Sequence, residues 1–540
     1  MTADASPLRP ARRALACGFA LLAACLCTLP PGCSDAKPVA GPVADATPAA
    51  PAAAPADSTP VARTAEAEPT EDAEPPLAGW DAPAAAIVIS GEQHGYVEPC
   101  GCSEKQSGGL ARRDDLIKQL ADRGWTVAGL DLGGTLKRSR KQSELKFDFT
   151  HHALADMGYR ALGLGVEELR MGADYLLGKH YETQEDARAE VPMVSANVAL
   201  YGDRSVGTPA LYRVFEAGGV RVGVTSVLGD SHAAKFAGND LLAIDPAAEA
   251  LPAALEAMDA ESPDVRILLS HALPDESEAL AEQFPQFDVV VTADGPEDGY
   301  DAQRVGETLV LRPSQKGKHV DVLGLYRAED GTVSLKAEQV DLDKDRFETS
   351  ARMVDRMRDY QEAIASLDLA ATEPAVSTAS GHGFAGAKDC GRCHKKAYAI
   401  WKDSKHAHAL ESLEKGRPGT EDWWVDRRRD PECLSCHVTG WDAQEVVRFD
   451  GGFDGTELTE HLAGNQCENC HGAGSAHSEL EWAFAKGADM TEAQQEARRS
   501  MHLDKEWASK NLCVRCHDGD NSPHFDFETY WPKVAHSGRD

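Results

Sequence analysis

Four short motifs in the last third of this 540-residue chain have the residue types and spacing of a covalent cofactor site. Each reads Cys-x-x-Cys-His, and the four copies begin at Cys390, Cys433, Cys467 and Cys513. Two thiols at this spacing can form thioethers with the two vinyl groups of one porphyrin, and the histidine that follows can bind its iron. This is the attachment pattern of c-type haem. A single copy would also suit zinc or a redox pair, but four copies that all end in histidine predict four covalent haems.

The four motifs supply two sets of predicted haem ligands. The covalent attachment residues are Cys390, Cys393, Cys433, Cys436, Cys467, Cys470, Cys513 and Cys516. The proximal iron ligands are His394, His437, His471 and His517. Because this region is poor in aliphatic runs, we expect the haems to form its core, with short helices and loops around them.

The second axial ligand decides whether an iron only transfers electrons or also carries out chemistry. An iron with two histidine ligands is closed, whereas a five-coordinate iron keeps an open position. Eight histidines outside the motifs are candidates for this position: His382, His406, His408, His461, His477, His502, His524 and His536. Several of them should be distal ligands, because a surface segment seldom needs so many imidazoles.

Some of these histidines lie in segments that resemble a known family. The stretches "CGRCHKKAYAIWKDSKHAHAL", "CENCHGAGSAH" and "SPHFDFETYWPKVAH" are similar to the tetrahaem cytochrome c that accepts electrons from hydroxylamine oxidoreductase, and to its multihaem relatives. The resemblance implies that His406, His477 and His536 are distal ligands, with His408 as a rival to His406. It also implies one haem with an open or weakly occupied sixth position. Ligation and solvent exposure remain alternatives for His382, His502 and His524.

A different pattern precedes these motifs, between Pro83 and Asp345. Apolar runs such as "AAIVIS", "VRVGVTSVL" and "VRILLSH" alternate with helical patterns and end in hairpin strands, which predicts an α/β sandwich. The loops "GEQHG", "LDLGG", "GVEE" and "LLSH" resemble the metal-binding loops of the metallophosphatase domain in the 5′-nucleotidase family. The fold class expected for the chain is therefore a metallophosphatase-like α/β sandwich, followed by a mainly α or irregular multihaem cytochrome c domain.

Most of the metal ligands that this resemblance implies are replaced. The opening Asp-x-His is Glu92 and His94, and the histidine of "LLSH" is kept as His271. The bridging aspartate is Gly134, which has no side chain to hold two ions close together. The Asn-His pair is Val166 and Glu167, and the closing Gly-His-x-His is the stretch 293–296, which includes Asp294. We expect no divalent metal and no phosphatase activity; a single ion on Glu92, His94, His271 and Asp294 is the alternative.

Cys100 and Cys102 follow the first of these loops in a Cys-Gly-Cys pair. In an exported protein, free thiols tend to oxidise, and the remaining cysteines of the mature chain have other predicted roles. A disulfide between Cys100 and Cys102 is the prediction. A redox function, a soft-metal site and a structural clamp are alternatives for the pair.

The N-terminus predicts export. Arg9, Arg12 and Arg13 precede the apolar stretch "ALACGFALLAACLCTL", which has the pattern of a signal peptide. Cys33 follows a small residue, as in a lipoprotein cleavage site, so residues 1–33 are predicted to be a signal peptide with Cys33 lipidated; ordinary secretion is the alternative. Residues 34–82, rich in Ala, Pro and acidic residues, are predicted to form a disordered tether.

The net charge of −33 argues against nucleic acid as a partner and leaves the lipid anchor as the expected membrane contact. The predicted organisation continues with a metallophosphatase-like domain at 83–345, a helical connector and loop at 346–386, and a tetrahaem domain at 387–540. The function expected is electron transfer to redox partner proteins in a periplasmic or cell-surface respiratory chain, with the first domain as scaffold or docking module. The alternatives are an oxidoreductase acting on a small nitrogen or sulfur compound at an open haem, and a residual phosphatase or nucleotidase.

Overall fold

A computed structural model describes residues 75–99, 107–185, 191–416, 420, 423–522 and 524–536. Within it, residues from Thr70 to Asp540 form one compact unit. The predicted signal peptide with Cys33, most of the tether, and the Cys100 and Cys102 pair lie outside the described residues. In the described part of the chain, no helix is both long and apolar enough to cross a membrane.

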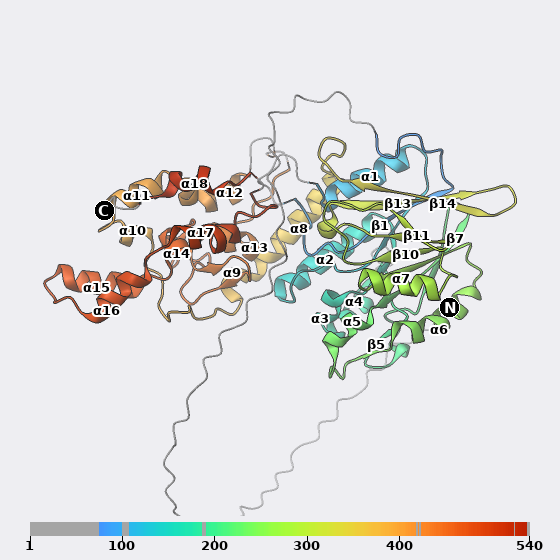
Figure 1. Ribbon diagram of the computed structural model, residues 1–540, viewed down its shortest axis with the longest axis horizontal. Coiled ribbons are helices and arrows are strands. Elements are labelled where there is room, and N and C mark those ends of the chain that lie inside the picture. Colours follow the sequence, from blue (N-terminus) through green and yellow to red (C-terminus); the bar gives the residue numbers. More distant parts are fainter. Residues whose placement is uncertain are drawn as a thin grey trace, which may run out of the picture. The chain divides into compact units, whose positions relative to one another are not determined.

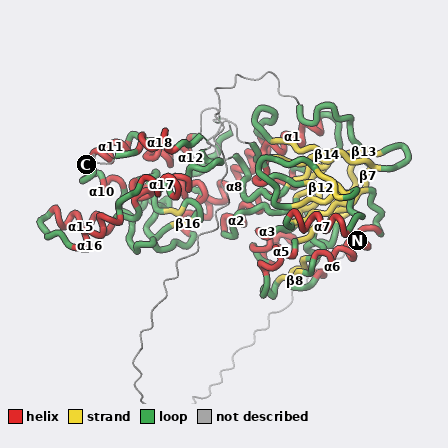
Figure 2. Tube along the Cα trace, viewed as in Figure 1, coloured by secondary structure: helices red, strands yellow, loops and turns green. Residues whose placement is uncertain are grey.

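The first folded region is built on two six-stranded sheets (Figures 1 and 2). The first sheet has the order β14-β13-β1-β2-β3-β4, with β1 to β4 parallel to one another and β13 antiparallel to both β1 and β14. Its strands are β1 (Ala85–Ser90), β2 (Val127–Asp131), β3 (Tyr159–Gly163), β4 (Met193–Val194), β13 (His319–Arg327) and β14 (Val333–Asp341). The antiparallel pair β13–β14 is the hairpin expected from the sequence.

The second sheet has the order β11-β12-β10-β9-β7-β6 and faces the first across an apolar core. Its strands are β6 (Arg213–Ala217), β7 (Val220–Leu228), β9 (Val265–His271), β10 (Val289–Thr292), β11 (Gln303–Val305) and β12 (Thr308–Leu311). Ile87 and Leu130 of the first sheet and Val222 and Ile267 of the second share this core, and all four are fully buried. The predicted α/β sandwich is thus confirmed. A small two-stranded sheet, β5 (Val198–Leu200) and β8 (Leu242–Ile244), lies outside it.

Helices cover both outer faces of the sandwich, as crossover connections between parallel strands require (Figure 1). Those of the first region are α1 (Leu110–Asp122), α2 (Lys141–Asp156), α3 (Val166–Arg170), α4 (Ala173–Glu185), α5 (Asp230–Ala233), α6 (Ala247–Asp259) and α7 (Pro274–Gln283), with single turns η1 (Arg204–Val206), η2 (Ala234–Phe236) and η3 (Gln315–Gly317). The apolar faces of α6 and α7 bury Leu251, Leu255 and Leu280 against the second sheet.

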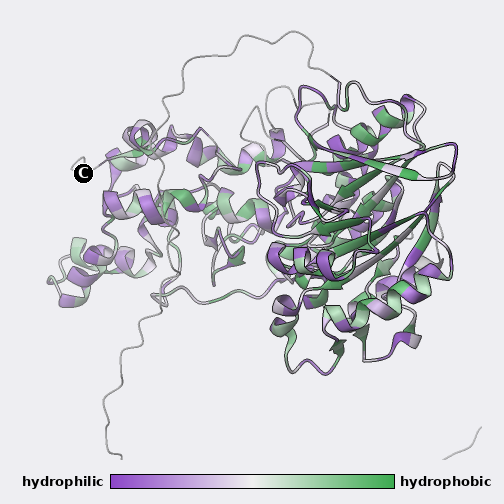
Figure 3. Cartoon of the chain, turned by 45° about the vertical axis from the view of Figure 1, so that its right-hand side comes forward, coloured by the Kyte–Doolittle hydropathy of each residue, from purple (hydrophilic) through white to green (hydrophobic). Residues whose placement is uncertain are grey.

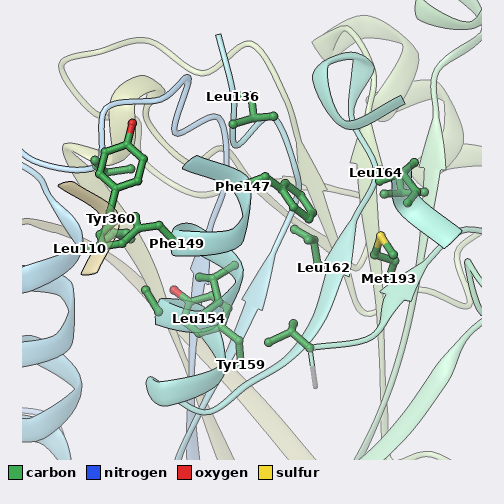
Figure 4. Close-up of a cluster of buried hydrophobic side chains, with 14 of the residues drawn as sticks. Leu110, Leu136, Phe147, Phe149, Leu154, Tyr159, Leu162, Leu164, Met193 and Tyr360 are labelled. Carbon is green, nitrogen blue, oxygen red and sulfur yellow. The ribbon is translucent and has the colours of Figure 1, made fainter. Parts of the chain in front are cut away.

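Two boundaries differ from the sequence prediction. Helix α8 (Ala351–Leu367), expected as a connector, buries Tyr360 and Ile364 in the same cluster as Phe147 and Phe149 of α2, so it belongs to the core of the first region (Figure 4). Leu77, predicted to lie in the tether, is also buried in the first region, with 2% of its surface exposed. Both differences arise from tertiary packing, which local composition does not reveal.

The second folded region consists of short helices and loops, with little apolar colour compared with the sandwich (Figure 3). Its elements are α9 (Leu369–Thr372), α10 (Ala387–Cys390), α11 (Lys395–Lys402), η4 (Lys405–His408), α12 (Ala409–Lys415), α13 (Pro431–His437), β15 (Trp441–Asp442), β16 (Val447–Arg448), η5 (Glu460–Leu462), α14 (Cys467–His471), α15 (Ser475–Ala485), α16 (Glu492–Ser500), α17 (Lys505–Asn511), η6 (Cys513–Arg515) and α18 (Phe527–Val534). Its described residues form a small apolar cluster that includes Leu434, Val438 and Leu462. This is the helical, irregular architecture expected of a region organised around haem.

Candidate functional site

Each Cys-x-x-Cys-His motif begins on a helical turn. Cys390 ends α10, Cys433 and Cys467 lie in α13 and α14, and Cys513 starts η6. Residues three apart on a helical turn face the same side, so the two thiols of a motif point together. None of these eight cysteines, all of which the structure describes, forms a disulfide. This is the arrangement that two thioether bonds to one porphyrin require.

Three pairs of histidine rings face each other across the second region. The ring centroids are 6.3 Å apart for His394 and His477, 6.1 Å for His406 and His517, and 5.8 Å for His471 and His536. Metal bonds to imidazole nitrogen are about 2.0–2.1 Å long, so an iron between two trans imidazoles separates their centroids by roughly 6 Å. The residues present therefore fit three irons, each with two histidine ligands.

Hydrogen bonds orient several of these imidazoles. The Nδ1 atoms of His437, His471 and His536 lie 2.7, 2.7 and 2.9 Å from the backbone oxygens of Ala409, Met501 and Val534. Because a carbonyl only accepts, Nδ1 must carry the proton, which leaves Nε2 bare to bind a metal. Burial also lowers the pKa of His437 and His471, and the neutral form is the one that binds iron.

Each predicted distal ligand comes from a segment that belongs to another motif. His477 follows the third motif and faces the first, His406 follows the first and faces the fourth, and His536 faces the third. The rival His408 is exposed and lies 3.0 Å from Glu411 through its Nδ1. The structure thus brings together His406, and not His408, with a proximal ligand. The other histidines outside the motifs, His382, His461, His502 and His524, are exposed.

The remaining proximal histidine, His437 of the second motif, differs from those of the other three motifs. Its Nδ1 lies 2.7 Å from the Ala409 oxygen and 3.3 Å from the Ser412 hydroxyl. Among the residues that the structure describes, no second histidine ring is stacked opposite it. The second motif is therefore the one at which an open sixth position, implied by the family resemblance, would fall.

Thiol contacts give the spatial order of the four motifs. A hydrogen bond joins Cys390 and Cys467, raising the pKa of Cys390 and lowering that of Cys467. A second bond joins Cys436 and Cys516, with the pKa of Cys436 lowered and that of Cys516 raised. Burial and the nearby Cys513 raise the pKa of Cys470 to about 12. The motifs therefore adjoin in the order first, third, fourth, second.

Glu468 and Gln466, within and beside the third motif, hold the start of the first motif. The Glu468 carboxylate is buried and accepts hydrogen bonds from the backbone amides of Ala385 (2.9 Å) and Gly386 (2.8 Å). The side-chain oxygen of Gln466 accepts one from the amide of Ala387. These bonds fix α10 beside α14, so the first and third attachment sites are held as a pair.

The loops that resemble a phosphatase site lie at the ends of β1 and β9. Glu92 is buried and accepts a hydrogen bond from the Gly295 amide at 3.1 Å, and the Nε2 atom of His94 lies 3.8 Å from its carboxylate. Burial raises the pKa of Glu92 to about 7. Burial lowers the pKa of His271 to about 3, and its Nδ1 has no hydrogen-bond partner. In the described ranges, no three acidic, histidine or cysteine side chains are grouped as a metal site.

Glu168, which sequence reasoning missed, stands at the centre of these loops. Its fully buried carboxylate accepts hydrogen bonds from the amides of Gly134 (3.0 Å), Thr135 (2.7 Å) and Gly165 (2.8 Å). A Cβ atom on Gly134 would lie 3.2 Å from both the Glu92 Cα and the His271 ring, tighter than most real contacts. The only sequence signal for Glu168 was its place in the "GVEE" loop, after Glu167.

The first region contacts the second and fourth motifs through ion pairs. Lys146 of α2 pairs with Glu432, the residue before Cys433, and donates a hydrogen bond of 3.1 Å to the Gly95 oxygen. Lys316 and Lys318, which both precede β13, pair with Asp520, which follows the fourth motif. Amide groups of Gln142 and Gln361 donate to Asp430 at 2.6 and 2.8 Å, and Asp430 also caps α13.

Comparison with known proteins supports a cytochrome in the second region. Residues 389–472 match the family model "Cytochrome c554 and c-prime". Cytochrome c-554 of Nitrosomonas europaea is 31% identical over 144 residues, which are 25% of this chain and 57% of that protein. The chain thus spans little more than half the length of this curated relative. The resemblance inferred from the motifs is confirmed, and it supports a multihaem cytochrome of electron transfer.

Solved structures resemble each region in turn. The 5′-nucleotidase precursor of Thermus thermophilus matches with a TM-score of 0.45 and 20% identity, over 54% of this chain and 61% of that one. The Thermus thermophilus sulfate thiohydrolase SoxB matches with a TM-score of 0.43 and 17% identity, over 55% and 64%. Reduced cytochrome c554 of Nitrosomonas europaea matches with a TM-score of 0.19 and 26% identity, over 29% and 79%.

Proposed function

We propose that this protein is an exported tetrahaem c-type cytochrome that transfers electrons between redox proteins in a periplasmic or cell-surface respiratory chain. The observation that carries the proposal is the set of three facing histidine pairs, each with a proximal ligand from one motif and a distal candidate from another segment. When bound in this way, c-type haem supplies a one-electron ferric/ferrous couple.

The chain's own residues would serve this transfer in three ways. The motif cysteines hold four attachment sites, and the facing histidines keep three of them closed to other ligands. Cys390 lies near Cys467, Cys470 near Cys513, and Cys436 near Cys516, so consecutive attachment sites are neighbours. Electrons would therefore move along one row of sites, with the first and second motifs at its two ends.

The first region would act as a scaffold for the second. Its ion pairs to Glu432 and Asp520 hold the segments of the second and fourth motifs, which supports a structural role. Export through the signal peptide, with a lipid on Cys33, would place this assembly outside the cytoplasm and near a membrane surface. No phosphatase chemistry is assigned to it, because Gly134 has no side chain to bridge two metal ions and the Glu168 carboxylate already accepts hydrogen bonds from three backbone amides.

The test is the haem content and ligation of the mature protein. Expression in a host with haem-attachment machinery should yield four covalent haems per chain, counted by the mass of the intact protein. Replacing both cysteines of one motif with alanine should remove one haem and leave three. Fewer than four haems in the unaltered protein would contradict the proposal.

A second candidate function is reduction or oxidation of a small nitrogen or sulfur compound at the second motif. It is favoured by one observation, that His437 has no second imidazole opposite it among the described residues. The reduced protein should then bind one carbon monoxide per chain, and the His477→Ala variant should bind two. If the unaltered protein binds none, the site at His437 is closed and this candidate fails.

A further inference from the structure

We propose that the surface around the first motif is the docking site for the acidic face of a redox protein, and the point at which electrons enter or leave the row of motifs. The inference rests on the proposed electron-transfer function. It adds where the partner binds and which charge its binding face carries. In the transfer, one electron passes between the iron of the first site and the partner; no bond forms or breaks and no proton moves.

The charge around the first motif is opposite to that of the whole protein. In a chain with a net charge of −33, six exposed basic residues lie between residues 388 and 405. They are Lys388, Arg392, Lys395, Lys396, Lys402 and Lys405, which we call the basic patch. Four of them, Lys388, Lys395, Lys402 and Lys405, form no ion pair with any residue in the described ranges. Arg392 forms an ion pair with Asp389, with 3.1 Å between nitrogen and oxygen, and Asp403 is the other acidic residue of this stretch.

The first motif is also the most exposed of the four. Of the eight motif thiols, all of which are described, only that of Cys393 belongs to an exposed residue, and His394 is exposed as well. Helix α11 carries three members of the basic patch and begins directly after His394. A partner that binds the patch would therefore come against the outer edge of the first attachment site.

At the other end of the row, basic residues are already paired. Lys146 is bound to Glu432 beside the second motif, and Lys316 and Lys318 are bound to Asp520 beside the fourth. These contacts cover the second and fourth motifs with the first region and leave little unpaired positive charge there. The third motif lies between the first and the fourth in the row, held to the first by Glu468. The first motif is thus the accessible end.

Electrostatics decides which kind of partner fits. At physiological ionic strength, electrostatic interactions are screened beyond about 8 Å. A partner close to the basic patch therefore interacts more strongly with the patch than with the distant acidic surface. Local fields of this kind raise association rates by roughly 10- to 1,000-fold and set orientation. An acidic face would be attracted and turned toward the first motif, and repelled elsewhere on this negatively charged protein.

Charged inorganic oxidants test the proposal on the haem-loaded, full-length protein. The reduced protein is mixed in stopped flow with ferricyanide, an anion that takes one electron. Its rate should fall as ionic strength rises. A variant with glutamine at the four unpaired patch lysines, Lys388, Lys395, Lys402 and Lys405, should react roughly tenfold more slowly at low ionic strength. The cation hexaammineruthenium(III) should instead react faster with this variant.

The matched control replaces four exposed lysines of the first region, Lys118, Lys141, Lys235 and Lys344, with glutamine. It changes the net charge by the same amount and should react with ferricyanide at nearly the unaltered rate. An equal slowing of both variants, or a wild-type rate that rises with ionic strength, would show that overall charge governs transfer and would overturn the proposal. Haem counts on the same samples separate this result from a failure of the electron-transfer function itself.

Discussion

The two folded regions both resemble metalloproteins, but their buried polar atoms are used differently. In the second region, histidine rings face one another at 5.8–6.3 Å, the spacing that a shared iron needs. In the first region, the carboxylate of Glu168 accepts hydrogen bonds from three backbone amides. The carboxylate of Asp131 accepts hydrogen bonds from the Ser90 hydroxyl at 2.6 Å and the Gly133 amide at 2.9 Å.

The difference shows what keeps a metal site intact. His94 and His271 remain at their places in the loops, whereas Gly134 and Val166 bring no ligand atoms. A metal needs donors that the chain itself leaves unbound, and it needs them on more than one side. Where a buried carboxylate already has its hydrogen bonds satisfied, exchanging them for a metal gains little.

The largest effect is expected when a distal histidine of the second region is removed. In the His406→Ala variant, one of the closed irons should lose its sixth ligand and change completely from low to high spin, as recorded by electron paramagnetic resonance of the ferric protein. His477→Ala and His536→Ala should each do the same at a different site. The control is His408→Ala, which should leave the spectrum unchanged; the reverse result would transfer the assignment from His406 to His408.

A stability measurement tests the role of the buried Glu168 carboxylate in the first region. Glutamine in place of Glu168 puts an amide donor either against the backbone amide of Thr135 or against those of Gly134 and Gly165. Leaving one buried donor unsatisfied costs about 1–3 kcal/mol, so the free energy of unfolding of the first region should fall by about that much. Denaturant titration followed by tryptophan fluorescence measures it. The neighbouring Glu167→Gln change is the control and should lower the free energy of unfolding by less. Equal losses in both variants would show that the hydrogen bonds of Glu168 contribute no particular stability.

The smallest expected effect depends on pH and concerns Asp321 in β13. Burial raises the pKa of Asp321 to about 7, and its Oδ2 has no hydrogen-bond partner. The folded protein thus keeps a proton that the unfolded chain releases above its ordinary pKa of 3.8. Stability should fall as the pH rises from about 4 to 7 and then level off.

Asparagine imitates the protonated acid, so Asp321→Asn should remove this part of the pH dependence. The gain in the free energy of unfolding should be roughly 1–3 kcal/mol at pH 8 and close to zero at pH 4. Thermal unfolding at both pH values measures it, with the exposed Asp330→Asn as control. A variant that is no more stable than the parent at pH 8 would contradict a protonated Asp321.

Much of this architecture could be predicted from the sequence because the relevant signals are local. The apolar runs of β1, β7 and β9 are buried along almost their whole length, as strands covered on both faces should be. The motif spacing likewise predicts the attachment residues from local sequence alone. By contrast, Glu168 and the packing of α8 depend on contacts between segments far apart in the chain. Spacing also left His406 and His408 as rivals, because two residues on one short turn differ only in the direction that the fold gives them.

The spatial order of the motifs has a consequence for how such a protein can be inherited. In this order the third and fourth motifs adjoin, but the first and second lie at opposite ends of the row, so the first two motifs do not form a contiguous half. Each of the facing histidine pairs likewise joins segments that a cut between the second and third motifs would separate, except for His471 with His536. A recombinant chain that inherited only the first two motifs would therefore lack every one of these histidine pairs, whereas one that inherited only the last two would keep a single pair.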